Sequence, residues 1–176
     1  MKNLVYIFIF TLTFACDNED ASNCFQTEGN LVQQEVAVNP FERILVNRDV
    51  ELIIKEGAEY IVIIETGENL LNDVKAFVID NQLQLTDNNS CNFVRDYGIT
   101  KVYVTAPNIF EIRNSSQYEV SSDGTLSYQN LKLVSEDSNI PGSFTIGDFR
   151  LQIDVEDLDV VANNISSFYI SGTVTN

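Results

Sequence analysis

The sequence predicts an all-β protein, and three observations lead to this fold class. Short runs rich in Val, Ile and aromatic residues alternate with turn residues between Phe41 and Ala106. No 3.6-residue periodicity continues long enough for a helix of several turns. After Pro107, similar apolar pairs recur at intervals of about 20 residues. We therefore expect a parallel β-helix, with a β-sandwich as the alternative.

The expected strands of the N-terminal part are short apolar runs bounded by turn residues. They cover 41–46, 50–56, 60–66, 74–80, 82–87 and 101–106. Two turns are sharp enough to predict hairpins, namely Glu56-Gly57-Ala58-Glu59 and Asp80-Asn81. A single helical turn is expected over 68–73, where polar residues surround a Leu pair.

Four segments after Pro107 align as a repeat of two apolar residues each. They are Ile109-Phe110-Glu111-Ile112, Asn130-Leu131-Lys132-Leu133, Arg150-Leu151-Gln152-Ile153 and Ser167-Phe168-Tyr169-Ile170. A period of about 20 is typical of β-helix coils, which bury their apolar side chains by stacking on one another. A β-sandwich has no reason to repeat at this interval. The alignment predicts that Phe110, Leu131, Leu151 and Phe168 form one inward-facing ladder.

The N-terminus has the layout of an export signal. Lys2 precedes an apolar run from Leu4 to Ala15. As a helix this run would rise about 18 Å, which is short of a hydrocarbon core of about 30 Å. Thr13-Phe14-Ala15-Cys16 resembles a lipobox. We expect cleavage before Cys16 and a lipid anchor on it, with an ordinary secreted protein or an uncleaved anchor as the alternatives.

Acidic residues follow the expected lipidation site directly. The segment Asp17-Asn18-Glu19-Asp20 resembles the acidic export tag of surface lipoproteins of the Bacteroidetes. The resemblance implies an outer-membrane protein that faces the outside. The alternatives are a hydrated tether that keeps the domain clear of the bilayer, and a location on the periplasmic face.

Composition excludes several classes of function. The chain carries 26 acidic and 10 basic residues, a net charge of −16, which argues against nucleic acid as a partner and against charge-driven binding to an anionic membrane. It contains no histidine, which removes Ser-His-Asp and Cys-His catalysis and His-bearing metal sites. We expect no catalytic residues and no cofactor. Paired carboxylates for polysaccharide hydrolysis are the less favoured alternative.

Several motifs together resemble one known family. They are Cys24-Phe25 with Gly29, Phe41-Glu42-Arg43-Ile44, Glu65-Thr66-Gly67-Glu68-Asn69-Leu70-Leu71, Asp80-Asn81-Gln82-Leu83, Asn89-Ser90-Cys91-Asn92-Phe93, Val102-Tyr103-Val104-Thr105-Ala106-Pro107 and Ile170-Ser171-Gly172. The chain is similar through them to the putative auto-transporter adhesin, head GIN domain family. The resemblance implies a right-handed β-helix with a hairpin-rich N-terminal portion.

The chain then divides into four parts. We expect a signal peptide over 1–15, an acidic tether over 16–23, an N-terminal β part over 24–106, and β-helix coils over 107–176. The coils end just past a strand, so we expect them to be incomplete at the C-terminus.

Two cysteines remain if Cys16 carries the lipid. Export places the chain in an oxidising compartment, where Cys24 and Cys91 are expected to form a disulfide. Polar turn residues flank each of them, which leaves room to meet the bond geometry. The alternatives are two separate buried thiols or an intermolecular bridge.

An acidic corner is the candidate metal site. The 20-residue register puts Glu136 over Glu156 and Asp137 over Asp157. Carboxylates stacked in this way repel one another unless they are hydrated or bridged by a cation. The corner is therefore a candidate calcium site, and a hydrated acidic corner is the alternative.

The sequence favours a binding module over an enzyme. The expected partners are the membrane, through the lipid on Cys16, and a glycan or protein ligand of the displayed domain. The candidate sugar-stacking aromatics are Tyr103, Tyr118, Tyr128 and Tyr169, for which core packing is the alternative. A structural envelope protein without its own ligand is the alternative function.

Overall fold

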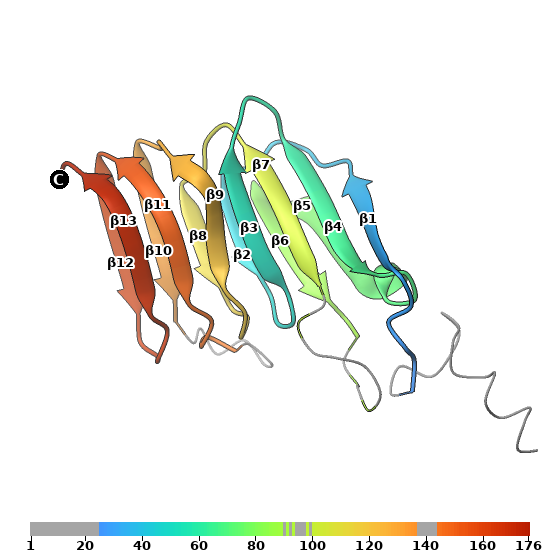
Figure 1. Cartoon of the computed structure of the whole chain (residues 1–176). Helices are drawn as coiled ribbons and strands as arrows, with labels where there is room; N and C mark the ends of the chain where they lie inside the picture. The colour runs from blue at the N-terminus through green and yellow to red at the C-terminus, as the bar shows by residue number, and fades with distance from the viewer. Residues whose placement is uncertain (1–24, 90, 92, 94–97, 99, 137–143) are drawn as a thin grey trace, which may run out of the picture.

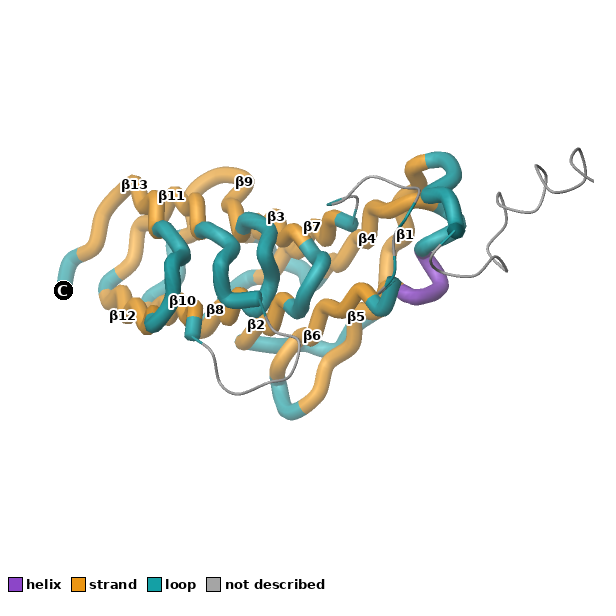
Figure 2. The backbone as a smooth tube through the Cα atoms, turned by 90° about the horizontal axis from the view of Figure 1, so that it is seen from below, coloured by secondary structure: helices purple, strands orange, loops and turns teal. Residues whose placement is uncertain are grey.

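The computed structural model describes residues 25–89, 91, 93, 98, 100–136 and 144–176, and two β-sheets that face each other make up its fold (Figures 1 and 2). Within these residues sheet A has the order β1-β4-β7-β3-β9-β11-β13 and sheet B the order β12-β10-β8-β2-β6-β5. A 3-10 helix, η1 (Leu71–Asp73), lies at the N-terminal end of both sheets (Figure 2). The all-β prediction is confirmed.

The strands of sheet A are β1 (Leu31–Val36), β3 (Glu51–Glu56), β4 (Ile61–Gly67), β7 (Lys101–Ala106), β9 (Val120–Leu126), β11 (Phe149–Val155) and β13 (Phe168–Val174). Those of sheet B are β2 (Arg43–Val46), β5 (Val74–Ile79), β6 (Gln82–Asp87), β8 (Glu111–Asn114), β10 (Asn130–Ser135) and β12 (Asp157–Ala162). The pairs β1–β4, β4–β7 and β5–β6 are antiparallel, and the other described pairs are parallel.

From β8 onward the chain alternates between the two sheets. β8, β10 and β12 lie side by side in sheet B, while β9, β11 and β13 lie side by side in sheet A (Figure 1). Parallel pairing requires such crossings, because a tight turn can join only antiparallel neighbours. Each circuit of the chain therefore adds one strand to each sheet.

The core fills the space between the sheets and follows from strand alternation. In β11 the residues Phe149, Leu151, Ile153 and Val155 are buried, while those between them are exposed. Strand register aligns inward side chains in rows that cross each sheet. One row of sheet B consists of Leu83, Ile44, Ile112, Leu133 and Val160.

The predicted inward ladder is wrong in its register. Leu131 belongs to sheet B and Leu151 to sheet A, so the two cannot stack in one row. Phe110 lies outside the strands and is 47% exposed. The first two repeated segments lie in sheet B and the last two in sheet A, and Ile112 and Leu133 have the expected stacking. Neighbours about 20 residues apart occur in the pairs β8–β10 and β11–β13, whereas Asn130 of β10 and Asp157 of β12 are 27 residues apart, so one interval does not fit every pair of neighbours.

One predicted hairpin is confirmed and the other is wrong. β5 and β6 pair across Asp80-Asn81, where both residues have positive φ, as the tightest hairpin turns require. The turn at Glu56-Gly57-Ala58-Glu59 connects β3 to β4, but β7 lies between these two strands and pairs with both. The expected helical turn is confirmed as η1.

Candidate binding site

A hollow on the outer face of sheet B brings together polar groups and an exposed aromatic ring. In the parallel register of β10 and β12, Asn130 pairs with Asp157 and Lys132 with Asp159. Their side chains share one face, because residues two apart on a strand point the same way. With Phe110, Leu131 and Leu158, they line a volume of about 280 Å³, which we name the Phe110 hollow.

The charges of the Phe110 hollow are arranged for hydrogen bonding. Lys132 Nζ lies 3.8 Å from Glu111 Oε2, so its charge is partly compensated. Asp157 and Asp159 are exposed, and among the described residues neither forms an ion pair. Carboxylates are acceptors only, whereas the amide of Asn130 can both donate and accept. The hollow can therefore bind a ligand that carries many hydroxyl groups.

A second hollow lies on the outer face of sheet A. Arg150 pairs with Tyr169 and Gln152 with Ser171, across β11 and β13. These four residues line a volume of about 400 Å³ together with Ser122, Leu151 and Ile170. We name it the Arg150 hollow. Both named hollows therefore lie on the last strands of the two sheets, on opposite faces of the domain (Figure 1).

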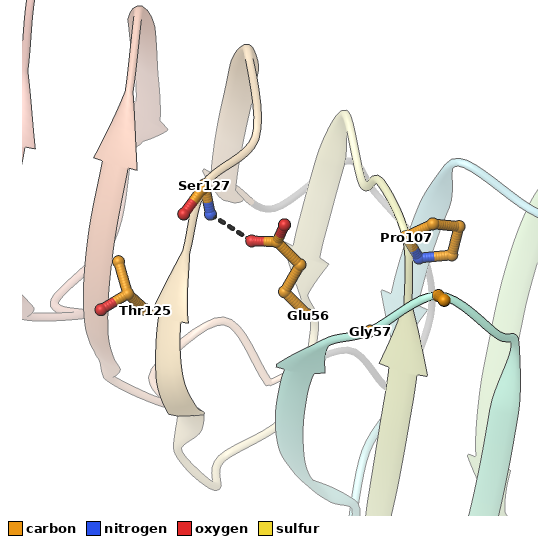
Figure 3. A pocket seen from close by; sticks show the side chains of 6 residues that line it. Glu56, Gly57, Pro107, Thr125 and Ser127 are labelled. Atoms are coloured by element: carbon orange, nitrogen blue, oxygen red, sulfur yellow. Dashed lines mark hydrogen bonds between the residues drawn. The ribbon is translucent and has the colours of Figure 1, made fainter.

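A third hollow lies where β3, β7 and β9 end, with a volume of about 490 Å³ (Figure 3). It is lined by Glu56, Gly57, Ala58, Pro107, Thr125 and Ser127. The Glu56 carboxylate accepts a hydrogen bond of 2.5 Å from the Ser127 backbone N–H, as Figure 3 shows. Glu56 therefore connects the end of β3 to the turn before β10 by a hydrogen bond, which is a structural role.

A buried polar cluster joins strand ends at the N-terminal end of the domain. Thr100 Oγ1 donates to Asp87 Oδ2 over 2.6 Å, and the hydroxyl oxygens of Thr66 and Thr100 are 2.9 Å apart. Asn89 N–H donates to Asp87 Oδ1 over 2.8 Å. Burial raises the pKa of the Asp87 carboxyl, and the hydrogen bonds from Thr100 and Asn89 partly oppose that rise. The cluster connects β4, β6 and β7.

The tyrosines that sequence reasoning grouped together are dispersed. Tyr128 is buried in the core, and burial raises the pKa of its hydroxyl above the ordinary value for tyrosine. Tyr103 is partly buried and donates to Glu65 Oε1 over 3.1 Å. Tyr118 is partly buried beside Gly98. Only Tyr169 among the four is exposed, at 50%.

The described acidic residues of the predicted calcium corner, Glu136, Glu156 and Asp157, do not stack as predicted. The register of β10 and β12 places Asp157 beside Asn130, at the opposite end of β10 from Glu136. Glu136 instead forms an ion pair of 3.3 Å with Arg113, and Glu156 accepts a hydrogen bond of 3.1 Å from Gln129. The expected stacking is therefore wrong, and Asp137 lies outside the described residues. No group of three or more potential metal ligands occurs in the part of the chain that the structure describes.

Two of the predicted cysteine sites lie outside the described residues, namely Cys16 and Cys24. Cys91 is described and partly buried. Its pairing with Cys24, and the lipid on Cys16, stay predictions. Among the described residues, no helix has the length and apolar character needed to cross a membrane.

Sequence reasoning missed most of the Phe110 hollow. It assigned Phe110 to the core and Asp157 to the acidic corner, and it did not single out Asn130, Lys132 or Asp159. The available signal was the alternation of polar and apolar residues in Asn130-Leu131-Lys132-Leu133 and Asp157-Leu158-Asp159, which predicts two strands with polar outward faces.

The described residues thus define an all-β domain of two facing, mostly parallel sheets with hollows on its outer faces. The chain belongs to the family described as "Putative auto-transporter adhesin, head GIN domain", whose model matches residues 40–176. The resemblance found in the sequence is therefore confirmed. Membership of an adhesin family implies a protein of the cell surface or a secreted protein.

Solved structures share this fold. A putative adhesin from Bacteroides fragilis superposes with a TM-score of 0.68 at 18% identity, covering 81% of this chain and 63% of its own. A putative adhesin from Parabacteroides merdae gives 0.58 at 15%, covering 75% and 53%. One from Parabacteroides distasonis gives 0.57 at 13%, covering 84% and 66%. The chain thus spans less than two thirds of each of these proteins. No similar sequence was found among curated proteins.

Proposed function

We propose that this protein is a non-catalytic adhesin of the cell surface that binds a neutral glycan in the Phe110 hollow. The observation that carries the proposal is the exposed Phe110 ring beside a two-by-two array of outward polar side chains. Membership of an adhesin family supports a binding role. The absence of histidine from the sequence supports a role without catalysis.

The chemistry of the hollow matches a sugar better than other ligands. An aromatic ring offers an apolar face to the C–H groups of a sugar ring. Asp157 and Asp159 accept hydrogen bonds from hydroxyl groups, and Asn130 adds a donor. The net charge of −16 repels polyanions at a distance, which favours a neutral glycan over an acidic one.

Substitution in the hollow tests this proposal on an array of neutral glycans. Phe110→Ala and Asp157→Asn should each abolish the binding that the unaltered domain shows. Phe77→Ala is the matched control, since Phe77 is also exposed, at 37%, but lies on β5 at the far end of sheet B. Retention of glycan binding by Phe110→Ala, or failure of the unaltered domain to bind any neutral glycan, would overturn the proposal.

We also propose that lipid on Cys16 anchors the domain to the outer membrane, facing outside. The lipobox-like sequence and the acidic segment after it support this anchor. Mass spectrometry of the protein purified from membranes should find an acylated Cys16 at the N-terminus. Cys16→Ala should release the protein from the membrane fraction. Protease treatment of whole cells should remove the domain, and protection of the domain would argue for the periplasmic face.

A disulfide between Cys24 and Cys91 is part of the same proposal. The rings of Phe25 and Phe93 have centroids 5.7 Å apart, which supports the close approach of the two chain segments. Such a bond would link the start of the domain to the connection between β6 and β7. Alkylation of intact protein without reductant should modify neither cysteine, and labelling of both would exclude the bond.

The alternation of β8–β13 between two sheets supports a further structural proposal, that this region is a right-handed parallel β-helix with two strands in each coil. An experimental structure with left-handed crossings, or without the stacking of Leu133 on Ile112, would contradict it.

A further inference from the structure

We propose that the Arg150 hollow is a second binding site, and that it recognises a sugar that carries a carboxylate. The site lies on the outer face of sheet A, whereas the Phe110 hollow lies on sheet B, so neither depends on the other (Figure 1). It is built on the paired strands β11 and β13. Their register places the cation of Arg150 beside the ring of Tyr169, and the amide of Gln152 beside the hydroxyl of Ser171.

The guanidinium of Arg150 is held in place by two contacts. Its Nε donates to Glu119 Oε2 over 3.0 Å, and its Cζ lies 4.5 Å from the centroid of the Tyr169 ring. A cation over an aromatic face is attracted by the quadrupole of the ring. These contacts use the Nε and one face of the guanidinium. Its terminal N–H groups donate to no residue in the described part of the chain, so they remain available to a ligand.

A bulge in β9 shapes one side of this hollow. The register of β9 against β11 shifts between Arg150 and Gln152, because Ser122, Asp123 and Gly124 stand opposite a single residue, Leu151. Gly124 has a φ of +92°, a conformation that glycine adopts readily. Ser122 Oγ accepts a hydrogen bond of 2.9 Å from the Gln152 backbone N–H. The bulge therefore places the Ser122 side chain at the rim of the hollow.

The donors in the hollow select the class of ligand. The two terminal nitrogens of a guanidinium match the two oxygens of a carboxylate. Gln152 and Ser171 lie on the neighbouring row, where they can bond the ring hydroxyls of the same molecule. Among the described residues that line the hollow, Arg150 is the one basic side chain. A single cation on a chain of net charge −16 suits one carboxylate rather than a polyanion such as a sulfated or phosphorylated polymer.

The decisive experiment compares two ligands that differ only in the carboxylate. Methyl β-glucuronide and methyl β-glucoside are titrated into the full domain by calorimetry and by ligand-observed NMR. The glucuronide should bind and the glucoside should bind at least about tenfold more weakly, as expected for loss of a charge-assisted bond. Equal binding of the two sugars, or binding of neither, would overturn the proposal.

Three variants assign the binding to Arg150. Arg150→Gln should reduce glucuronide affinity at least about tenfold, and Arg150→Lys should also weaken it, because an ammonium is not a planar fork. Lys101→Gln is the matched control, because it removes the same charge from a side chain on the same sheet and should leave affinity unchanged. Phe110→Ala should likewise leave it unchanged, which separates this site from the proposed function. Unaltered affinity in Arg150→Gln, or displacement of the glucuronide by an equal concentration of inorganic phosphate, would count against a sugar-acid site.

Discussion

The two ends of the domain are built differently. At the N-terminal end, β1, β4, β5 and β6 take part in antiparallel pairs, and the buried cluster around Asp87 ties strand ends together. At the C-terminal end, β10 to β13 are parallel, and the edge strands are β12 and β13 (Figure 2). The first end carries the β5–β6 hairpin and η1, whereas the second end consists of parallel strands.

Burial and surface chemistry change together along this axis. The sheet B row that is fully buried at Leu83, Ile44, Ile112 and Leu133 reaches Val160 with 43% of that side chain exposed. Both named hollows lie at the same end as Val160. The comparison indicates that the N-terminal and middle strands supply most of the stability. The last strands carry both proposed binding hollows, and four predictions test this division.

The largest effect is expected from Ile112→Ala. Ile112 is fully buried in the middle of the row, so its loss removes apolar contacts and leaves a cavity, which typically costs about 2–5 kcal/mol. Val160→Ala in the same row is the matched control and should cost less than about 1 kcal/mol, because the site is already partly hydrated. Urea unfolding measures both. Equal costs would show that β12 contributes as much to the core as β8 does.

The second effect concerns two glycines with positive φ in the C-terminal strands. A Cβ at Gly172 would lie 1.9 Å from Ile153 O on the paired strand β11, whereas one at Gly124 would meet nothing within 4 Å. Gly172→Ala should therefore separate β13 from β11 and lower the free energy of unfolding by about 1–3 kcal/mol. Gly124→Ala should lower it only through backbone strain. Hydrogen exchange of the β11 amides reports the separation. Unchanged exchange in Gly172→Ala would mean that β13 is not held by this close approach.

The third effect is the pH dependence that Asp87 gives to the N-terminal end. Because burial raises the folded-state pKa of Asp87 above 3.8, the folded state holds this proton more tightly than the unfolded state. The contribution of Asp87 to stability is thus fully present below the unfolded pKa, and it is lost as pH rises through the folded pKa. Asp87→Asn should remove that decline. Urea unfolding from pH 3 to 7 compares the two proteins, and identical slopes would contradict the assignment.

The local sequence pattern locates most strands, but it does not give their order in the sheets. The runs over 82–87 and 101–106 were predicted with their observed bounds, because each alternates buried apolar and outward residues. The insertion of β7 between β3 and β4 has no local signature, since it depends on which distant strand pairs with which. β9 was missed because Ser121-Ser122-Asp123-Gly124 is polar and bulged.

The candidate site could not be assembled from the sequence for the same reason. The assumed 20-residue register put Asp157 beside Asp137, whereas Asp157 pairs with Asn130, 27 residues earlier, in the same sheet. It also put Phe110 into a core row with Leu131 and Leu151, which belong to different sheets. A shift in the pairing of two strands changes which of their side chains lie side by side on one face. A surface hollow formed by side chains of two strands therefore cannot be predicted when the strand register is wrong.

The smallest effect is expected from the ion pair between β3 and the neighbouring strand β9. Lys55 on β3 lies 3.3 Å from Asp123 in the β9 bulge, and their side chains are 59% and 65% exposed. Solvent and salt screen such a pair, so its coupling in a double-mutant cycle of Lys55→Ala and Asp123→Ala should be about 0–0.5 kcal/mol. The cycle is measured by urea unfolding in low salt and again in 1 M NaCl, where the coupling should vanish because the screening length falls to about 3 Å.

A cycle of Arg113→Ala and Glu136→Ala is the control, because Arg113 is only 19% exposed and its pair should retain more coupling in salt. If the Lys55 and Asp123 pair exceeded that control, the two ends of the domain would be joined by surface charge, and the division between a stabilising end and a displayed end would have to be redrawn.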